Sequence, residues 1–410
     1  MLNLLYIDPG TGSMLFSLAI GICTAAVFAF RVVIVKLRLL LSGGKADKVS
    51  QNKIPYLIFS DHKRYWNVFK PICDEFEKRK INLVYYTQSP DDPALNQNYE
   101  FVKSEFIGEG NKGFVRMNML NAGSVLATTP GLDVLQWKRS KTVDRYIHIP
   151  HSLDELSLYR MFGLDFYDAV LCSGKNQVDS IKKLEEIRIN APKKELLILG
   201  STYMDNAYER VKTFTRTKNE VPVVLVAPSW GVNSLLNRFG ERLISILIES
   251  GFKIIVRPHP QSLTAEKDML DNLKSKFEGS PVEWNFDNDN LAVLNRADIM
   301  ISDFSGVIYD FAFLFGRPVI CTKLKESLNT LPFDADWLDG KPWCIEAPEK
   351  FGYMLDEENL SSIKDLILSA LDSKALSDGR DAVKSECWAN VGNSTGLIVD
   401  YLTGNFNLGS

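Results

Sequence analysis

The chain has 410 residues, enough for about two or three domains. Its hydrophobic content of 45% and charged content of 24% are typical of a globular protein with a large core. The formal net charge of −4 argues against a general nucleic-acid binder. The six cysteines are scattered and form no C-x-x-C pair, so we expect reduced thiols in a cytosolic setting rather than disulfides or a zinc site.

The N-terminal segment predicts a membrane span. Residues 13–30 carry no charge, and a span requires about 20 apolar residues. A cleaved signal peptide would need a basic region first, but residues 1–13 contain only Asp8. The cations come afterwards, so the positive-inside rule places the N-terminus outside and the chain after about residue 42 in the cytoplasm. We therefore expect an extracytoplasmic segment (1–12), a transmembrane helix with a basic flank that contacts anionic membrane lipids (13–41), and a polar linker (42–54).

Two similar-sized halves follow, each opening with a proline-led apolar strand. The first half, 55–205, alternates buried strands with a helix; the strands are expected at 55–60, 81–87, 125–128, 146–149, 169–172 and 195–200, and the helix at 64–80. Residues 206–221 are interpreted as an interdomain connection. The second half, 222–375, repeats the alternation with strands at 222–228, 253–256, 299–301 and 318–322 and helices at 237–250, 263–277 and 363–371. Further helices are expected in 376–410, and the whole pattern predicts two parallel, doubly wound, Rossmann-like domains.

Residues 299–318 form the most informative stretch of the sequence. An apolar strand passes directly into a helix through a short polar run: Ser302, Asp303, Phe304, Ser305 and Gly306. Such a turn leaves free backbone N–H groups at the helix N-terminus, which favours a bound phosphate over an ordinary polar cap. Asp310 lies one helical turn further on, where it could reach a ribose hydroxyl.

Two loops that follow strands of the second half carry groups suited to a ligand. Arg257 offers a planar donor fork for phosphate, and His259 can donate to a phosphoryl oxygen or carry a proton. The alternative is a rigid proline turn with a solvated arginine. Small residues around Ser229 allow a ligand to approach the backbone closely, while Trp230 can be a core, hinge or contact residue.

In the first half, a histidine follows a strand end. His151 lies beyond the strand 146–149, facing the expected cleft, where it could be the base that activates an acceptor hydroxyl. His148 is interpreted as a structural histidine. For Asp205, the sequence favours a helix-cap role and a site role equally.

Together these motifs resemble the CDP-glycerol glycerophosphotransferase family, which includes the teichoic acid polymerases. The resemblance rests on Arg257–Pro260 (RPHP), the stretch 301–320, residues 227–230 (APSW), the Gly and Asp of 200–205, and His151 of a W-H-G motif. The sequence departs from the family pattern at Pro150 and Ser152, which replace Trp and Gly, and at Gly306, which replaces a Ser.

The resemblance implies a GT-B fold with an active-site cleft between its two domains. It implies a nucleotide-activated donor in the second half and a polyprenyl-linked acceptor that is activated by His151. The residues expected to contact the donor are Arg257, His259, Asp303, Ser305, Gly306 and Asp310, with Ser302 and Ser229 beside them. We expect catalytic roles for His151 and His259, and neither a metal nor a cofactor.

The activity implied is transfer of glycerol phosphate from CDP-glycerol in bacterial surface-polymer synthesis at the cytoplasmic membrane. The alternatives are a GT-B glycosyltransferase that uses a nucleotide sugar, since a Ser-Gly pair followed by an acid also occurs in nucleotide-sugar enzymes, and a non-catalytic nucleotide-binding membrane protein.

Overall fold

The computed structural model describes residues 53–406 except 189, 191, 217, 218, 288 and 324–333. The predicted extracytoplasmic segment, the transmembrane helix of 13–41 and nearly all of the linker lie outside the described residues. Within the described ranges, no helix is both long and apolar enough to cross a membrane. From Ile54 onward the chain forms one compact unit built on two parallel sheets.

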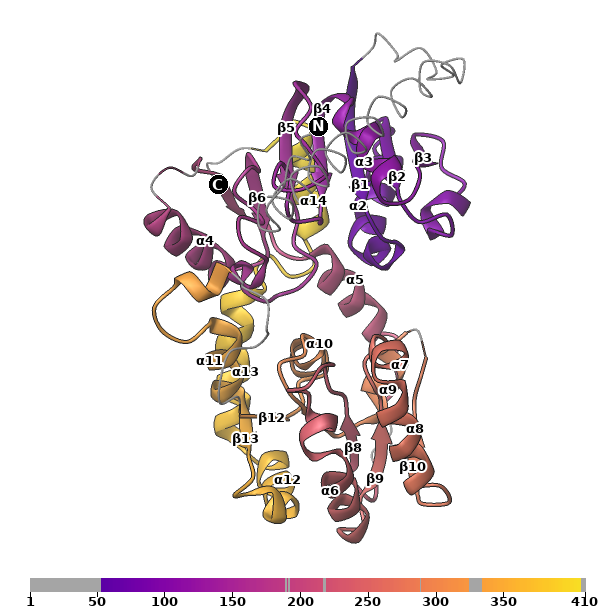
Figure 1. The fold of residues 1–410 in the computed structure, drawn as a ribbon, viewed down its shortest axis with the longest axis vertical. Helices are drawn as coiled ribbons and strands as arrows, with labels where there is room; N and C mark the ends of the chain where they lie inside the picture. Colours follow the sequence, from indigo (N-terminus) through magenta and orange to yellow (C-terminus); the bar gives the residue numbers. More distant parts are fainter. Residues whose placement is uncertain are drawn as a thin grey trace, which may run out of the picture. The chain divides into compact units, whose positions relative to one another are not determined.

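The first sheet has seven parallel strands in the order β3-β2-β1-β4-β5-β6-β7 (Figure 1). Its strands are β1 (Ile54–Ser60), β2 (Leu83–Thr87), β3 (Val102–Phe106), β4 (Asn121–Ala127), β5 (Thr142–His148), β6 (Ala169–Cys172) and β7 (Glu195–Ile198). Strands β1, β2 and β6 are mostly apolar, whereas β4 and β5 form a continuous buried run only in their last three residues. We call the residues up to β7 the first half.

The second sheet has six parallel strands in the order β10-β9-β8-β11-β12-β13. They are β8 (Val223–Val226), β9 (Lys253–Val256), β10 (Val282–Trp284), β11 (Ile299–Ser302), β12 (Val319–Thr322) and β13 (Gly352–Leu355). The residues from β8 onward are the second half. The predicted pair of parallel, doubly wound sheets is thus confirmed.

Helices connect the strands of both sheets. They are α2 (Trp66–Lys78), α3 (Asn111–Asn118), α4 (Lys175–Ile187), α5 (Thr202–Val211), α6 (Leu235–Glu249), α7 (Ser262–Ala265), α8 (Lys267–Lys276), α9 (Leu291–Arg296), α10 (Val307–Phe315), α11 (Trp343–Phe351), α12 (Ile363–Leu371), α13 (Lys374–Cys387) and α14 (Ser394–Leu402).

Several segments tie the two halves together, among them α13, which packs on α4. Helix α5 leaves the first sheet, packs on α2 and then contacts α9 and α10 of the second half (Figure 1). The 3₁₀ helix η4 (Asp334–Trp337) returns to the first half, where the Asp334 carboxylate pairs with Arg188 and accepts from the Phe162 N–H at 2.9 Å. Helix α14 also returns, and its Ile398 and Val399 join the first-half core.

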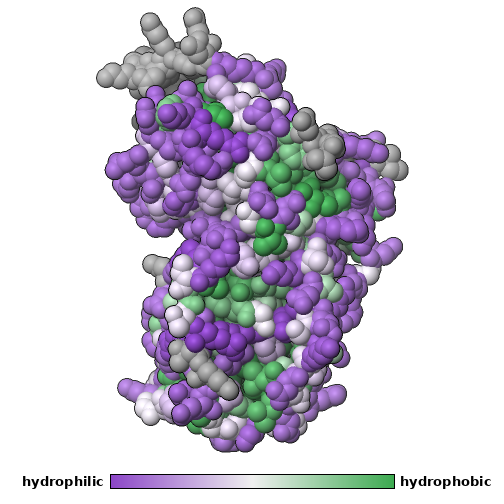
Figure 2. Space-filling view, turned by 180° about the vertical axis from the view of Figure 1, so that it is seen from behind, coloured by the Kyte–Doolittle hydropathy of each residue, from purple (hydrophilic) through white to green (hydrophobic). Residues whose placement is uncertain are grey.

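The surface near η4 carries exposed apolar side chains. Phe162, Phe166, Ile187 and Trp337 border a hollow of about 610 Å³. On the face drawn in Figure 2, the surface is mostly hydrophilic and apolar residues gather in a few patches.

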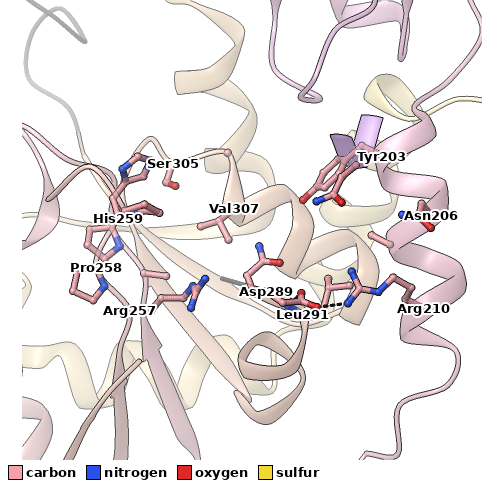
Figure 3. Close-up of a pocket in the computed structure, with 17 residues that line it drawn as sticks. Tyr203, Asn206, Arg210, Arg257, Pro258, His259, Asp289, Leu291, Ser305 and Val307 are labelled. Carbon is pink, nitrogen blue, oxygen red and sulfur yellow. Dashed lines mark hydrogen bonds and ion pairs between the residues drawn. The ribbon is translucent and has the colours of Figure 1, made fainter. Parts of the chain in front are cut away.

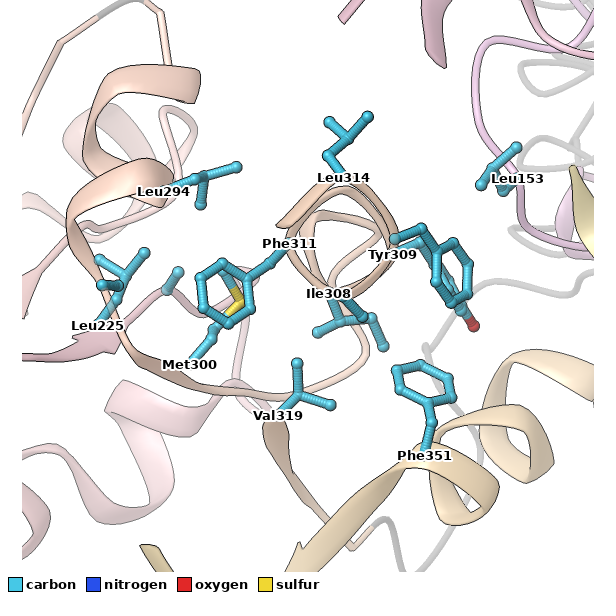
Figure 4. Close-up of a cluster of buried hydrophobic side chains, with 14 of the residues drawn as sticks. Leu153, Leu225, Leu294, Met300, Ile308, Tyr309, Phe311, Leu314, Val319 and Phe351 are labelled. Atoms are coloured by element: carbon cyan, nitrogen blue, oxygen red, sulfur yellow. The ribbon is translucent and has the colours of Figure 1, made fainter. Parts of the chain in front are cut away.

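Helix α10 is held by a buried cluster on several of its sides (Figure 4). Ile308 and Phe311 pack with Met300 of β11 and Val319 of β12. Tyr309 points toward Phe351 of α11, and the same cluster includes Leu153 of the first half. The helix N-terminus is therefore fixed by packing from both halves.

Candidate functional site

The second sheet has its topological switch point between β8 and β11. These strands are neighbours, but the chain leaves β8 toward β9 on one side and leaves β11 toward β12 on the other. Open parallel sheets bind ligands in the crevice at the carboxyl ends of such strands. A cavity of about 600 Å³ lies there, lined by the loops after β8, β9 and β11, the start of α9, helix α5 and Asn67 of α2 (Figure 3).

Arg257 and His259 both line this cavity, as the sequence pattern indicated. The Arg257 guanidinium donates to the Asn285 side chain and to the Asp287 carbonyl oxygen, the latter at 2.6 Å. The Nδ1 atom of His259 accepts from the Gln261 N–H at 3.1 Å, so the neutral ring carries its proton on Nε2. Burial lowers the pKa of His259 below its ordinary value, which favours this neutral, donating form.

The start of α10 forms the adjoining wall. Ser305, Gly306 and Val307 line the cavity, and Gly306, the N-cap residue, offers no side-chain hydrogen bond to the helix. The N–H groups of Ile308 and Tyr309 donate to the Ser305 and Gly306 carbonyl oxygens at 3.1 Å each, which leaves the Gly306 and Val307 N–H groups at the helix N-terminus to attract an anion. This wall therefore has the properties of a phosphate-binding turn.

Three of the predicted donor-binding residues form hydrogen bonds that brace the turn before α10, and they do not line the cavity. The Ser302 hydroxyl donates to the Ala227 carbonyl oxygen at 2.6 Å. The Asp303 carboxylate accepts from the backbone N–H groups of Ser229 and Leu235, each at 2.8 Å, and is only 1% exposed. The structure thus gives Ser302, Asp303 and Ser229 a bracing role, and their contact with a donor stays a prediction.

Asp310 lies behind the cavity wall. Its carboxylate accepts a hydrogen bond from the Tyr203 hydroxyl, and burial raises its pKa to about 6. Tyr203 and Asn290 line the cavity in front of it. Asp310 can therefore orient Tyr203, while its predicted contact with a ribose remains untested.

On the first half, His151 sits among aromatic rings rather than in the cavity lining. Its ring centroid lies 4.9 Å from that of Tyr65 and 6.4 Å, nearly parallel, from that of Tyr159. Burial, with a smaller effect of the Arg64 charge, lowers its pKa to about 4. His148 is fully buried and its Nε2 lies 3.2 Å from the Tyr159 hydroxyl, which fits the structural role expected for it.

The charge of Arg64 acts on both histidines expected to be catalytic, which the sequence motifs did not reveal. Arg64 follows the carboxyl end of β1, and its charge lowers the pKa of both His151 and His259, where burial is the larger cause. Its guanidinium stacks over the Tyr65 ring at 4.8 Å. The signal that could have found it is its position after β1, which has β2 on one side and β4 on the other, because open parallel sheets bind ligands at the carboxyl ends of such strands.

Asp154 is a second residue beside the site that the sequence motifs did not reveal. Its Oδ2 lies 3.3 Å from where a Cβ on Gly306 would stand, so any side chain at position 306 must share space with this carboxyl group. Burial, followed by the charges of Glu155 and Asp310, raises the pKa of Asp154 to about 7. Asp154, Asp303 and Asp310 are thus three acidic groups with raised pKa values around the start of α10.

Asp205 and Trp230 have other roles. The Asp205 carboxylate accepts from the Trp388 indole at 3.0 Å and from the Ser394 hydroxyl at 2.6 Å, while Ser201 caps α5. Asp205 therefore holds the C-terminal segment and is not the cap. Trp230 is 47% exposed and is not a core residue.

Residues 53–406, with the gaps given above, contain no cluster of three or more His, Cys, Asp or Glu side chains placed to hold a metal ion. Five of the cysteines lie in this part, and each is a buried free thiol: Cys73, Cys172, Cys321, Cys344 and Cys387.

The bracing role of Asp303 can be tested by stability measurements. Asp303→Ala leaves two buried N–H groups without their acceptor, so the free energy of unfolding should fall by about 3 kcal/mol in a urea titration. Asp303→Asn keeps one acceptor oxygen and should lose less. An Asp303→Ala protein of normal stability would contradict the bracing role.

Comparison with known proteins gives three kinds of match. The sequence profile of the family described as CDP-Glycerol:Poly(glycerophosphate) glycerophosphotransferase matches residues 158–324. The minor teichoic acid biosynthesis protein GgaB of Bacillus subtilis (strain 168) is 31% identical over 137 residues, which make up 33% of this chain and 13% of GgaB. The chain thus spans a small part of that relative's length.

Solved structures resemble the chain over most of its length. The wall teichoic acid polymerase TagF, soaked with CDPG, has a TM-score of 0.55 at 14% identity and covers 92% of this chain and 98% of its own. The UDP-GlcNAc 2-epimerase of Neisseria meningitidis bound to UDP-GlcNAc has a TM-score of 0.53 at 12% identity and covers 86% of this chain and 100% of its own. Identities this low show the fold alone, which is GT-B-like. The resemblance that the motifs predicted is confirmed by the profile, and residues 158–324 carry the sequence pattern of the CDP-glycerol glycerophosphotransferase family.

Proposed function

We propose that this protein is a membrane-anchored transferase of bacterial cell-surface polymer synthesis. It moves a glycerol-phosphate or similar polyol-phosphate group from a CDP-linked donor to a lipid-linked glycan or polymer. One observation carries the proposal: the cavity at the switch point brings Arg257, His259 and the open N-terminus of α10 together, all within the residues that match the family.

The groups in this cavity suit phosphoryl transfer. The acceptor hydroxyl oxygen forms a bond to the donor's β-phosphorus, and the bond from that phosphorus to the bridging oxygen breaks, so that CMP leaves with the electron pair. Positively charged or N–H donors that face the phosphate oxygens stabilise the charge of the transition state. Arg257, the Nε2–H of His259 and the N–H groups of Gly306 and Val307 are such donors.

The acceptor's proton requires a base, and His151 is proposed for this role. It lies just before the residues that match the family and belongs to the first half. With a pKa lowered to about 4, its ring is neutral near pH 7 and able to accept a proton. The acceptor and the membrane anchor in residues 13–41 are parts of the proposal that rest on the sequence.

A nucleotide-sugar glycosyltransferase is the second candidate. Gly306 replaces the second Ser of the family pattern, and Asp154 occupies the adjoining space. The GT-B-like structures also include HepE of Anabaena in complex with UDP and glucose, with a TM-score of 0.50 at 11% identity over 85% of this chain and 99% of its own. The donor's base and transferred group therefore need a direct test.

Donor binding tests the proposed site. Arg257→Ala and His259→Ala each remove a donor to phosphate, so each should weaken binding of CDP-glycerol by about 1.5–3 kcal/mol in calorimetry. Arg242→Ala, in an exposed ion pair with Glu357 outside the cavity, is the matched control and should bind normally. Unchanged affinity in both cavity variants would remove this site assignment, and tighter binding of UDP-sugars would favour the second candidate.

Turnover and its pH dependence test His151. His151→Ala should lower turnover by about 10²–10⁴-fold while donor affinity changes little, because the residue lies in the first half. Since its pKa is lowered to about 4, His151 stays neutral between pH 7 and pH 5, and its titration should not reduce turnover over that range. A folded His151→Ala protein with near-normal turnover would show that another group, or none, takes the proton.

A further inference from the structure

A second arginine borders the cavity and is not used by the mechanism above. Arg210 lies near the end of α5, the helix that joins the two halves, and Asp289 lies just before α9. Both line the cavity, and the Arg210 guanidinium forms an ion pair with the Asp289 carboxylate across its edge (Figure 3).

The Asp289 carboxylate serves two cations. Partial burial alone would raise its pKa, but the pKa is lowered, first by the hydrogen bond from Arg210, then by the Leu291 N–H at 3.1 Å, and also by the charges of Arg210 and Arg257. Arg257 in turn feels the charge of Asp287 and, less strongly, that of Asp289. The Asp289 carboxylate therefore pairs directly with Arg210 and also acts by its charge on Arg257, and both arginines line the same cavity.

The ion pair between Arg210 and Asp289 can be replaced by a contact with a ligand at little cost in folding stability. The Arg210 and Asp289 side chains are 43% and 52% exposed, and exposed ion pairs contribute little to stability because water screens them. A diphosphate carries more charge than one carboxylate and offers more acceptor oxygens, so it competes well for guanidinium groups.

We propose that Arg210 is a donor-binding residue for the diphosphate of a nucleotide-linked donor, and that Asp289 holds Arg210 in place until the diphosphate displaces it. The proposal rests on the proposed function, because it assumes that the cavity binds such a donor. It adds a contact from α5, so that the connecting helix takes part in recognising the donor. The rival explanation is a plain tether, in which the pair only fastens α5 to the segment before α9.

The two explanations predict different changes in donor affinity when the Asp289 charge is removed. If Asp289 competes with the diphosphate, its removal strengthens binding, whereas removal of Arg210 weakens binding. If the pair is a tether, both changes disturb the cavity in the same direction or have no effect on affinity.

The experiment measures the affinities of CDP-glycerol and UDP by calorimetry for the full chain and four variants. Arg210→Ala should weaken binding roughly 10- to 100-fold, and Arg210→Lys less, because it keeps the charge. Asp289→Asn should bind about two- to five-fold more tightly, since it keeps the size of the side chain and removes the charge. Glu283→Gln breaks the exposed ion pair with Arg296 outside the cavity and should leave affinity unchanged.

Thermal unfolding of each variant accompanies the titrations, so that a loss of fold is not mistaken for a loss of contact. Normal affinity in a folded Arg210→Ala protein, or weaker binding by Asp289→Asn, would overturn the proposal. If Arg257→Ala weakens binding while Arg210→Ala does not, this inference fails and the proposed function stands. If the unaltered protein binds neither nucleotide, both fail.

Discussion

The geometry of the candidate site depends on the hydrogen bonds that the Asp303 carboxylate accepts. It stands at the carboxyl end of β11 and accepts two backbone hydrogen bonds, from the loop after β8 and from the first residue of α6. These bonds fix the two loops that diverge at the switch point. A buried carboxylate that satisfies two N–H groups is costly to replace, because the N–H groups would remain buried without an acceptor. The turn that exposes the start of α10 is held open in this way.

Around this brace, the cavity collects groups from both halves. Helix α5 brings Tyr203 and Arg210, α2 brings Asn67, and the loop after β9 brings Arg257 and His259. Asp205 fastens α5 to the C-terminal segment, so the connecting helix is itself held at a second point. The halves are therefore joined by α5, η4 and α14, and a movement of one half against the other would change the cavity that α5 borders.

Much of this arrangement follows from local sequence signals, and the exceptions have physical reasons. The interior strands were predicted from their buried apolar residues, although β4 and β5 were predicted only in their C-terminal parts, because their first residues are polar or exposed. Of the four edge strands, β7 was predicted and β3, β10 and β13 were missed. Strand β3 exposes Lys103 and Glu105, and β10 has only three residues, so neither shows a buried run. Edge strands are covered on fewer sides and need fewer apolar residues.

The site was predicted where side chains follow their own strand into the crevice, as Arg257 and His259 do. It was not predicted where the role depends on a distant partner. The sequence suggests Ser302 and Asp303 as ligand contacts, but in the structure their polar atoms form hydrogen bonds with the loop after β8. Arg210 and Asp154 reach the site through the packing of the two halves, which spacing along the chain does not encode.

The central claim, that this cavity binds a CDP-linked donor for transfer, is tested most directly by a product assay. The full chain would be incubated in membranes with CDP-glycerol, and in parallel with UDP- and GDP-linked sugars, and the released nucleotide and extended acceptor would be analysed. The account predicts release of CMP together with glycerol phosphate on a lipid-linked acceptor. Release of UDP or GDP with transfer of a sugar, and no reaction with CDP-glycerol, would contradict it.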